Sequence, residues 1–181
     1  MTPSERGEPV TGSPRSGVTT REENHPRGTS VTNEADAVLP VLFVGHAELP
    51  DGVRSAVEMI LGPQEKLATV QLGPAADPAA VSRQIADALD GLQVDPQAGA
   101  LILADLPGGS PSNAAAAVFL EQRHLRLVAG LSLPMALEVL IDRQGRTAAD
   151  LAEVAVGAGR MGVSDVSAAL AEAAGSTGTA S

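Results

Sequence analysis

Two apolar runs constrain this chain more than any other feature, because each resembles a buried strand that ends abruptly in polar or small residues. The first is Val41-Leu42-Phe43-Val44-Gly45-His46, and the second begins at Leu101 and ends in Asp105-Leu106-Pro107-Gly108-Gly109-Ser110. In open parallel sheets, ligands collect outside the carboxyl ends of the strands, where the strand order reverses. We therefore expect His46 and Asp105 to meet at such an edge.

The rest of the chain alternates between strand-like runs and segments with helical periodicity. Strands are predicted over residues 38–44, 67–72, 100–104 and 125–128, and helices over 49–61, from Pro78, from Pro111 after a Ser110 cap, from Pro134, and from the capping box at Thr147 to about Ala158. The apolar stripe of the helix over 49–61 is predicted to include Ile60, and that of the helix from Pro134 to include Ile141, both facing the sheet. This alternation predicts an α/β three-layer sandwich with a mainly parallel sheet, strand order 2-1-3-4 and helices on both faces. One edge of so small a sheet is expected to be completed by another chain.

Composition divides the 181 residues into one domain with two tails. Residues 1–37 are rich in Pro, Gly, Ser and Thr and carry no apolar period, so we expect a disordered amino-terminal extension. Residues 38–170 form the predicted domain, and residues 171–181 a flexible tail. Since the two phenylalanines are the only aromatic residues, Ala, Val, Leu and Ile must fill the core.

Charge and residue usage exclude several classes of protein. The net charge of -10 disfavours nucleic-acid binding, because an acidic surface repels the phosphate backbone. The absence of cysteine excludes disulfides, thiol catalysis and thiolate metal sites. No run approaches the roughly 18 apolar residues of a membrane span, and no signal-peptide core precedes the domain. The expectation is a cytoplasmic protein.

The expected site combines a nucleophile, an orienting carboxylate and an anion-binding turn. Neutral imidazole is a nucleophile near neutral pH, and a carboxylate bonded to one ring nitrogen leaves the other free to attack. The alternatives are that His46 only ends a strand and that Asp105 only caps a turn. Gly108, Gly109 and Ser110 lead into a helix amino terminus, which suits a phosphoryl group. Ser110 is a weaker candidate nucleophile, because Ser112 stands where a Gly-x-Ser-x-Gly elbow needs its last glycine.

Other α/β classes fit less well. The turn after the first run lacks the Gly-x-Gly-x-x-Gly of a dinucleotide fold. A receiver domain expects an acidic pair there and a lysine late in the chain, but the only lysine is Lys66. The other histidines are His25 in the extension and His124 in a charged link, where we expect solvated surface. With three scattered histidines and no cysteine, neither a metal site nor any other cofactor is expected.

Residues 38 to about 170 resemble the IIA domain of the mannose-type (mannose/fructose/sorbose) sugar phosphotransferase system. The resemblance rests on a histidine just after the first strand and on Asp105-Leu106-Pro107-Gly108-Gly109-Ser110-Pro111-Ser112-Asn113. Val128-Ala129-Gly130-Leu131-Ser132-Leu133-Pro134-Met135 and Gly159-Arg160-Met161-Gly162-Val163 also fit.

The resemblance implies a phosphotransferase component that works through a phosphohistidine. His46 would accept a phosphoryl group from the phosphocarrier HPr and pass it to a separate IIB protein, which links it to a membrane sugar permease. Asp105 would orient the histidine, Ser110 would help to hold the phosphoryl group, and the chain would be a homodimer. A phosphotransfer subunit of a dihydroxyacetone kinase remains an alternative. So does a regulatory module whose docking patch of Leu49, Leu106, Leu131 and Met135 switches with phosphorylation.

Overall fold

The computed structural model describes residues 37–122 and 124–176. The predicted disordered extension therefore lies outside the described residues, apart from Ala37, and so does the end of the predicted tail. The described elements are β1 (Val41–His46), α1 (Leu49–Leu61), β2 (Leu67–Leu72), α2 (Pro78–Gly91), β3 (Ala100–Ala104), α3 (Ser110–Glu121), β4 (Leu125–Ala129), α4 (Leu133–Asp142), α5 (Ala148–Met161) and α6 (Val166–Ser176). None of these helices is long and apolar enough to cross a membrane.

The four strands form one parallel sheet in the order β2-β1-β3-β4, which confirms the predicted topology. β1 is central, and its register places His46 opposite Leu72 on one side and Val44 opposite Ala104 on the other. Residues Val41 to Gly45 are all buried, as expected for a strand covered on both faces. Because β1 and β3 are adjacent and parallel, their carboxyl ends lie side by side.

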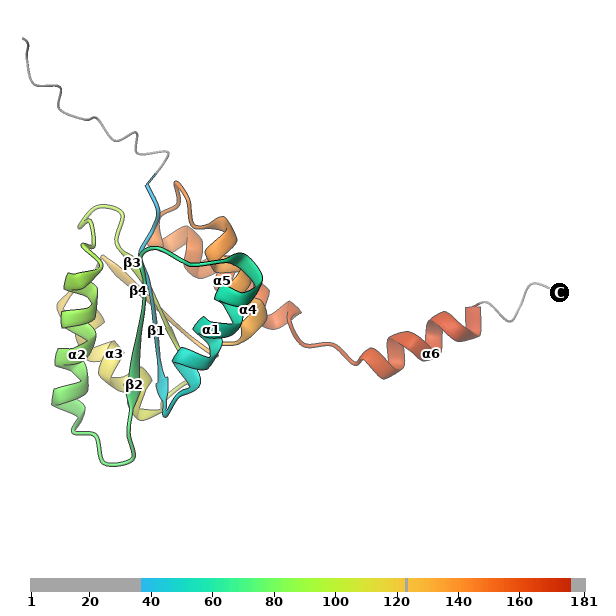
Figure 1. The fold of residues 1–181 in the computed structure, drawn as a ribbon, viewed down its shortest axis with the longest axis horizontal. Coiled ribbons are helices and arrows are strands. Elements are labelled where there is room, and N and C mark those ends of the chain that lie inside the picture. The colour runs from blue at the N-terminus through green and yellow to red at the C-terminus, as the bar shows by residue number, and fades with distance from the viewer. Residues whose placement is uncertain (1–36, 123, 177–181) are drawn as a thin grey trace, which may run out of the picture. The chain divides into compact units, whose positions relative to one another are not determined.

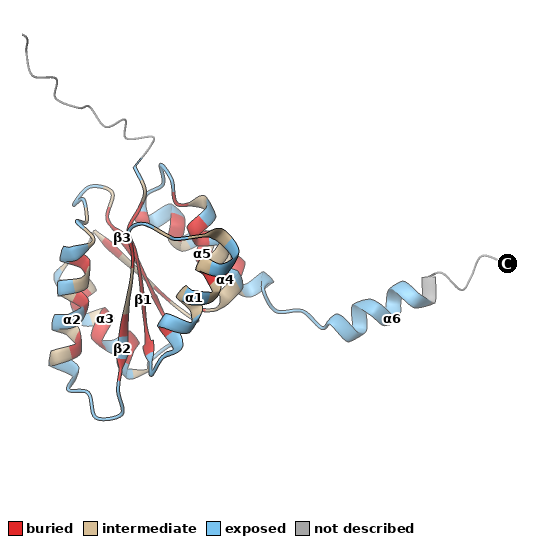
Figure 2. Ribbon diagram, in the orientation of Figure 1, coloured by how far each residue is buried: buried red, intermediate tan, exposed pale blue. Residues whose placement is uncertain are grey.

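Helices cover both faces of the sheet, so the molecule has three layers (Figure 1). On one face α1, α4 and α5 pack against Val41, Phe43, Leu101 and Leu103. On the other face α2 and α3 pack against Leu42, Val44 and Ile102. Figure 2 shows the buried residues concentrated in the strands and along the helix sides that face them. Since side chains alternate along each strand, the same four strands supply both cores.

The helix starts follow from proline and capping residues. Asp77 caps α2, accepting the N–H groups of Ala79 and Ala80, and Pro78 is the first residue of this helix, as predicted. Thr147 and Asp150 form the predicted capping box of α5, although the helix continues to Met161 rather than ending near Ala158.

Several local predictions are wrong. The first strand begins at Val41 rather than Val38, since Val38 makes only an isolated bridge to Gln144. Ile60 is 52% exposed and Ile141 64% exposed, so neither belongs to an inward stripe. In α4 the buried positions are Met135, Ala136, Val139 and Leu140, which turns Ile141 away from the sheet.

The predicted domain boundary at residue 170 falls inside a helix. α6 spans Val166–Ser176, so residues 171–176 are helical where a flexible tail was expected. The sequence here is rich in alanine, the residue with the highest helix propensity, and Asp165 accepts the N–H of Ala168 near the helix start.

Candidate functional site

His46 and Asp105 meet at the carboxyl edge of the sheet. His46 is the last residue of β1, and Asp105 directly follows β3, where its N–H donates to the carbonyl of Val44. The Nδ1 atom of His46 lies 2.8 Å from Oδ2 of Asp105. The histidine side chain is 51% exposed and the aspartate side chain 8% exposed. The geometry therefore pairs a buried carboxylate with an imidazole that solvent and a partner can reach.

Asp105 is held as an ionised carboxylate by several donors. Its Oδ2 also accepts the backbone N–H of His46 at 2.8 Å, and its Oδ1 accepts the N–H of Leu106 at 2.7 Å. Burial acts to raise the pKa of Asp105, but the N–H groups of His46 and Leu106 and the nearby imidazole outweigh it. The pKa of Asp105 therefore lies below its ordinary value of 3.8.

Gly45 leaves the room that Asp105 needs. A Cβ atom at Gly45 would lie 3.0 Å from Oδ2 of Asp105 and 3.1 Å from Cγ of the buried Pro50. A larger residue before the histidine would therefore push on the carboxylate or on the first turn of α1. The sequence alone indicates no role for Gly45, because the space that it leaves matters only where Asp105 and Pro50 come close to it.

Gly109 leaves room for the histidine ring. A Cβ atom here would lie 3.2 Å from Cε1 of His46. The N–H of Gly109 donates to the carbonyl of Leu106 at 3.2 Å, so it is already engaged rather than open to an anion as expected. The Cε1 edge of the His46 ring, which lies between the two ring nitrogens, therefore faces the turn that leads into α3.

Ser110 stands at the amino terminus of α3. The cap is Gly109, in extended geometry, and Ser110 is the first helical residue rather than the cap that the sequence predicted. The first N–H groups of a helix lack intrahelical partners and carry partial positive charge. Pro111 has no N–H, so the N–H groups of Ser110 and Ser112 are the ones that this terminus offers. Gly108, with φ of 73°, provides the left-handed turn before it.

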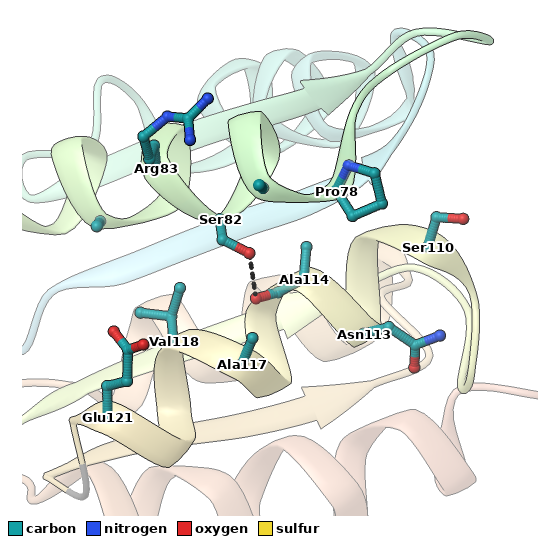
Figure 3. A pocket seen from close by; sticks show the side chains of 11 residues that line it. Pro78, Ser82, Arg83, Ser110, Asn113, Ala114, Ala117, Val118 and Glu121 are labelled. Carbon is teal, nitrogen blue, oxygen red and sulfur yellow. Dashed lines mark hydrogen bonds between the residues drawn. The ribbon is translucent and has the colours of Figure 1, made fainter.

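A groove of about 590 Å³ runs between α2 and α3 and begins beside Ser110 (Figure 3). Small apolar side chains line most of it, and Ser82 donates to the carbonyl of Ala114 across it at 3.3 Å. Arg83 and Glu121 lie at the end away from Ser110. Neither His46 nor Asp105 lines this groove, so it adjoins the pair without containing it.

The other candidates lie elsewhere. His124 precedes β4, at the amino edge of the sheet, and is partly buried rather than fully solvated; His25 lies outside the described residues. Over residues 37–122 and 124–176, no group of three His, Asp or Glu side chains could hold a metal ion. The predicted apolar docking patch is wrong for two of its members: Leu49 and Leu106 are exposed, but Leu131 and Met135 are buried.

Residues 40–156 match the family model described as "PTS system fructose IIA component". The mannose-specific EIIAB component of Escherichia coli strain K12 is 30% identical over 126 residues, which cover 69% of this chain and 38% of that protein. The chain thus spans about two fifths of that relative. The sorbose-specific EIIA component of Lacticaseibacillus casei is also 30% identical, over 62% of this chain and 80% of its own length.

Solved structures agree with these relatives. The phosphotransferase component EIIA from Streptococcus agalactiae superposes with a TM-score of 0.65 at 25% identity, covering 72% of this chain and 98% of that one. A mannose/sorbose-specific IIA subunit from Enterococcus faecalis gives the same TM-score and identity, over 72% and 96% of the two chains. Because the family model covers well over half of the sequence, the chain belongs to the mannose-type IIA family of the sugar phosphotransferase system.

Proposed function

We propose that this chain is a phosphocarrier that accepts a phosphoryl group on Nε2 of His46 from phospho-HPr and passes it to a IIB protein for sugar uptake. One observation carries the proposal. The bond of 2.8 Å between Nδ1 of His46 and Asp105 fixes which ring nitrogen holds the proton and leaves Nε2 as the nucleophile. The exposure of the ring lets a protein partner approach that nitrogen.

The transfer needs alignment and charge stabilisation rather than new covalent chemistry in the protein. The lone pair of Nε2 forms a bond to phosphorus, while the bond from phosphorus to the donor's histidine nitrogen breaks and its electron pair returns to the donor ring. The proton on Nδ1 stays between His46 and Asp105. As the His46 ring gains positive character, the carboxylate of Asp105 offsets it. The reverse sequence of bond changes delivers the group to the acceptor.

The turn before α3 is proposed to hold the phosphoryl oxygens. The hydroxyl and N–H of Ser110 supply donors at the helix terminus, where the dipole favours an anion. Gly109 contributes space beside the ring, and Gly108 contributes the positive φ that brings the chain back towards the sheet. The site residues of the proposal are therefore His46, Asp105, Gly108, Gly109 and Ser110.

The partners and location form part of the same proposal. The sorbose- and fructose-specific EIIA relatives support a role in sugar transport, and the E. coli relative is an EIIAB component. We propose that HPr is the donor, that the IIB acceptor is a separate protein linking the chain to a membrane permease, and that the chain acts as a homodimer in the cytoplasm.

The proposal is tested by transferring labelled phosphate from phosphoenolpyruvate through enzyme I and HPr to the purified chain. Wild type and His124→Ala should acquire an acid-labile, base-stable label, and His46→Ala should not. The His124 variant is the matched control, since it removes an imidazole at the opposite edge of the sheet. A folded wild-type chain that takes no label from its cognate HPr would overturn the proposal.

A further inference from the structure

The peptide unit between Gly108 and Gly109 is held at both ends. Its carbonyl, on Gly108, accepts a hydrogen bond from Nδ2 of Asn113 at 3.1 Å. Its N–H, on Gly109, donates to the carbonyl of Leu106 at 3.2 Å. Two adjacent glycines would otherwise let this unit rotate with little steric hindrance, because neither carries a Cβ atom.

Asn113 holds the carbonyls of both glycines. Its side-chain NH₂ group donates to the carbonyl of Gly108, and its backbone N–H donates to the carbonyl of Gly109 at 2.9 Å. The second bond belongs to any α-helix with Gly109 as its cap, but the first needs a side chain with a hydrogen-bond donor at this position. Figure 3 shows Asn113 on the first turn of α3 with Ser110 close by.

We propose that Asn113 is a positioning residue, which keeps the Gly108–Gly109 peptide in the orientation that His46 requires. Carbonyl oxygens bear partial negative charge, so a peptide turned over here would bring the Gly108 carbonyl against the carbonyl of Leu106, which now accepts the Gly109 N–H. It would also change the φ angle of Gly109, where a Cβ atom would lie 3.2 Å from Cε1 of His46. The inference deepens the proposed function and rests on it where transfer rates are concerned.

The test compares wild type with Asn113→Leu, which keeps the side chain's approximate size and removes its donor. Leucine has the higher helix propensity, so a loss of activity would not come from unravelling of α3. Gln84→Leu is the matched control, because it makes a similar change at an exposed position of α2. The measurements are hydrogen exchange of the Gly109 amide, thermal unfolding, and the kinetics of phosphoryl transfer from phospho-HPr.

In Asn113→Leu, we expect the Gly109 amide to exchange about fivefold faster and the maximal transfer rate to fall about fivefold, which corresponds to one ordinary hydrogen bond. The phospho-HPr concentration for half-maximal rate and the melting temperature should stay near wild type, as should every measurement on Gln84→Leu. Unchanged exchange at Gly109 together with an unchanged maximal rate would overturn the inference. If wild type itself takes no label, the proposed function fails, and the exchange measurement alone decides whether Asn113 holds the peptide.

Discussion

A single oxygen of Asp105 binds both the backbone N–H and the ring Nδ1 of His46, each at 2.8 Å. The first bond fixes the end of β1, and the second fixes the orientation and tautomer of the ring. The carboxylate thus controls where Nε2 points as well as which nitrogen is free.

Asp105→Asn should slow phosphoryl transfer more than it destabilises the fold. The three groups around the carboxylate are all N–H donors, so an amide NH₂ group must face at least one of them. With the NH₂ group in the place of Oδ2, the ring is pushed towards the tautomer with its proton on Nε2, and we expect a loss of about a hundredfold in rate. Single-turnover labelling gives the rate, and ¹⁵N chemical shifts of the ring give the tautomer. A variant with wild-type rate and tautomer would contradict this role.

Because the pKa of Asp105 is lowered in the folded chain, ionisation of this carboxyl group should contribute to the free energy of unfolding, and the contribution should be lost in acid. A carboxyl group whose folded pKa lies below its unfolded value stabilises the fold above the unfolded value and loses that effect as the pH falls. The difference in unfolding free energy between wild type and Asp105→Asn should therefore be full above about pH 4, and should shrink as the pH drops through 3.8 towards the folded pKa. Urea unfolding of both proteins at a series of pH values measures it. A difference independent of pH would show that the carboxylate is not preferentially ionised in the folded state.

Gly45→Ala should crowd the carboxylate of Asp105 and destabilise the fold. The added methyl group meets Oδ2 of Asp105 and the ring of Pro50, so we expect a loss of about 1–3 kcal/mol in unfolding free energy. Gly52→Ala, in α1 with open space around its Cβ position, is the control and should stabilise the chain by about 0.5 kcal/mol. Equal effects of the two substitutions would mean that the sheet edge relaxes around the new methyl group.

Gly108→Ala and Gly109→Ala should separate backbone strain from crowding of the site. At Gly108 the φ of 73° disfavours alanine by about 1–2 kcal/mol, although nothing lies near the new Cβ atom. At Gly109 the φ of -69° suits alanine, but its methyl group contacts the His46 ring. We therefore expect the larger loss of stability in the first variant and the larger loss of phosphoryl transfer relative to stability in the second. The reverse pattern would contradict the proposed contact.

Arg143 lies away from the site and should contribute to the stability of the fold. Its buried guanidinium donates to the carbonyls of Leu39, Glu65 and Lys66 and to the side chain of Gln64. Arg143→Leu leaves these acceptors without their donor and should cost about 3 kcal/mol. Arg146→Leu breaks an exposed pair with Asp142 and removes the attraction to the exposed Asp150, and it should leave the melting temperature near wild type. Thermal unfolding with similar losses in both variants would contradict the distinction.

The sequence was sufficient to predict strand bounds where turn residues border an apolar run. Leu67–Leu72 and Ala100–Ala104 have the predicted bounds, because apolar runs are bordered there by turn residues. The meeting of His46 and Asp105 followed from strand order alone, since adjacent parallel strands bring their carboxyl ends to one edge.

Proline gave the helix starts only to within one residue. Pro78 is the first residue of α2, whereas Pro50, Pro111 and Pro134 are the second residues of their helices. Both positions tolerate a missing N–H, so a serine before a proline does not identify the cap. The cap at Gly109 depends on backbone angles that its neighbours impose.

The remaining features arise from contacts between distant segments. Arg143 is charged, and its burial is explained only by the convergence of three backbone carbonyl groups from residues 39, 65 and 66. The space that Gly45 and Gly109 leave likewise depends on how separate segments approach one another. No local pattern in the sequence encodes these distances.

The most direct measurement is the position of the phosphoryl group on the His46 ring, determined by ³¹P and ¹⁵N NMR after transfer from phospho-HPr. Because Asp105 occupies the Nδ1 side, we predict a phosphorus bond to Nε2 with the proton retained on Nδ1. A phosphoryl group on Nδ1 of His46, or on another residue, would contradict it.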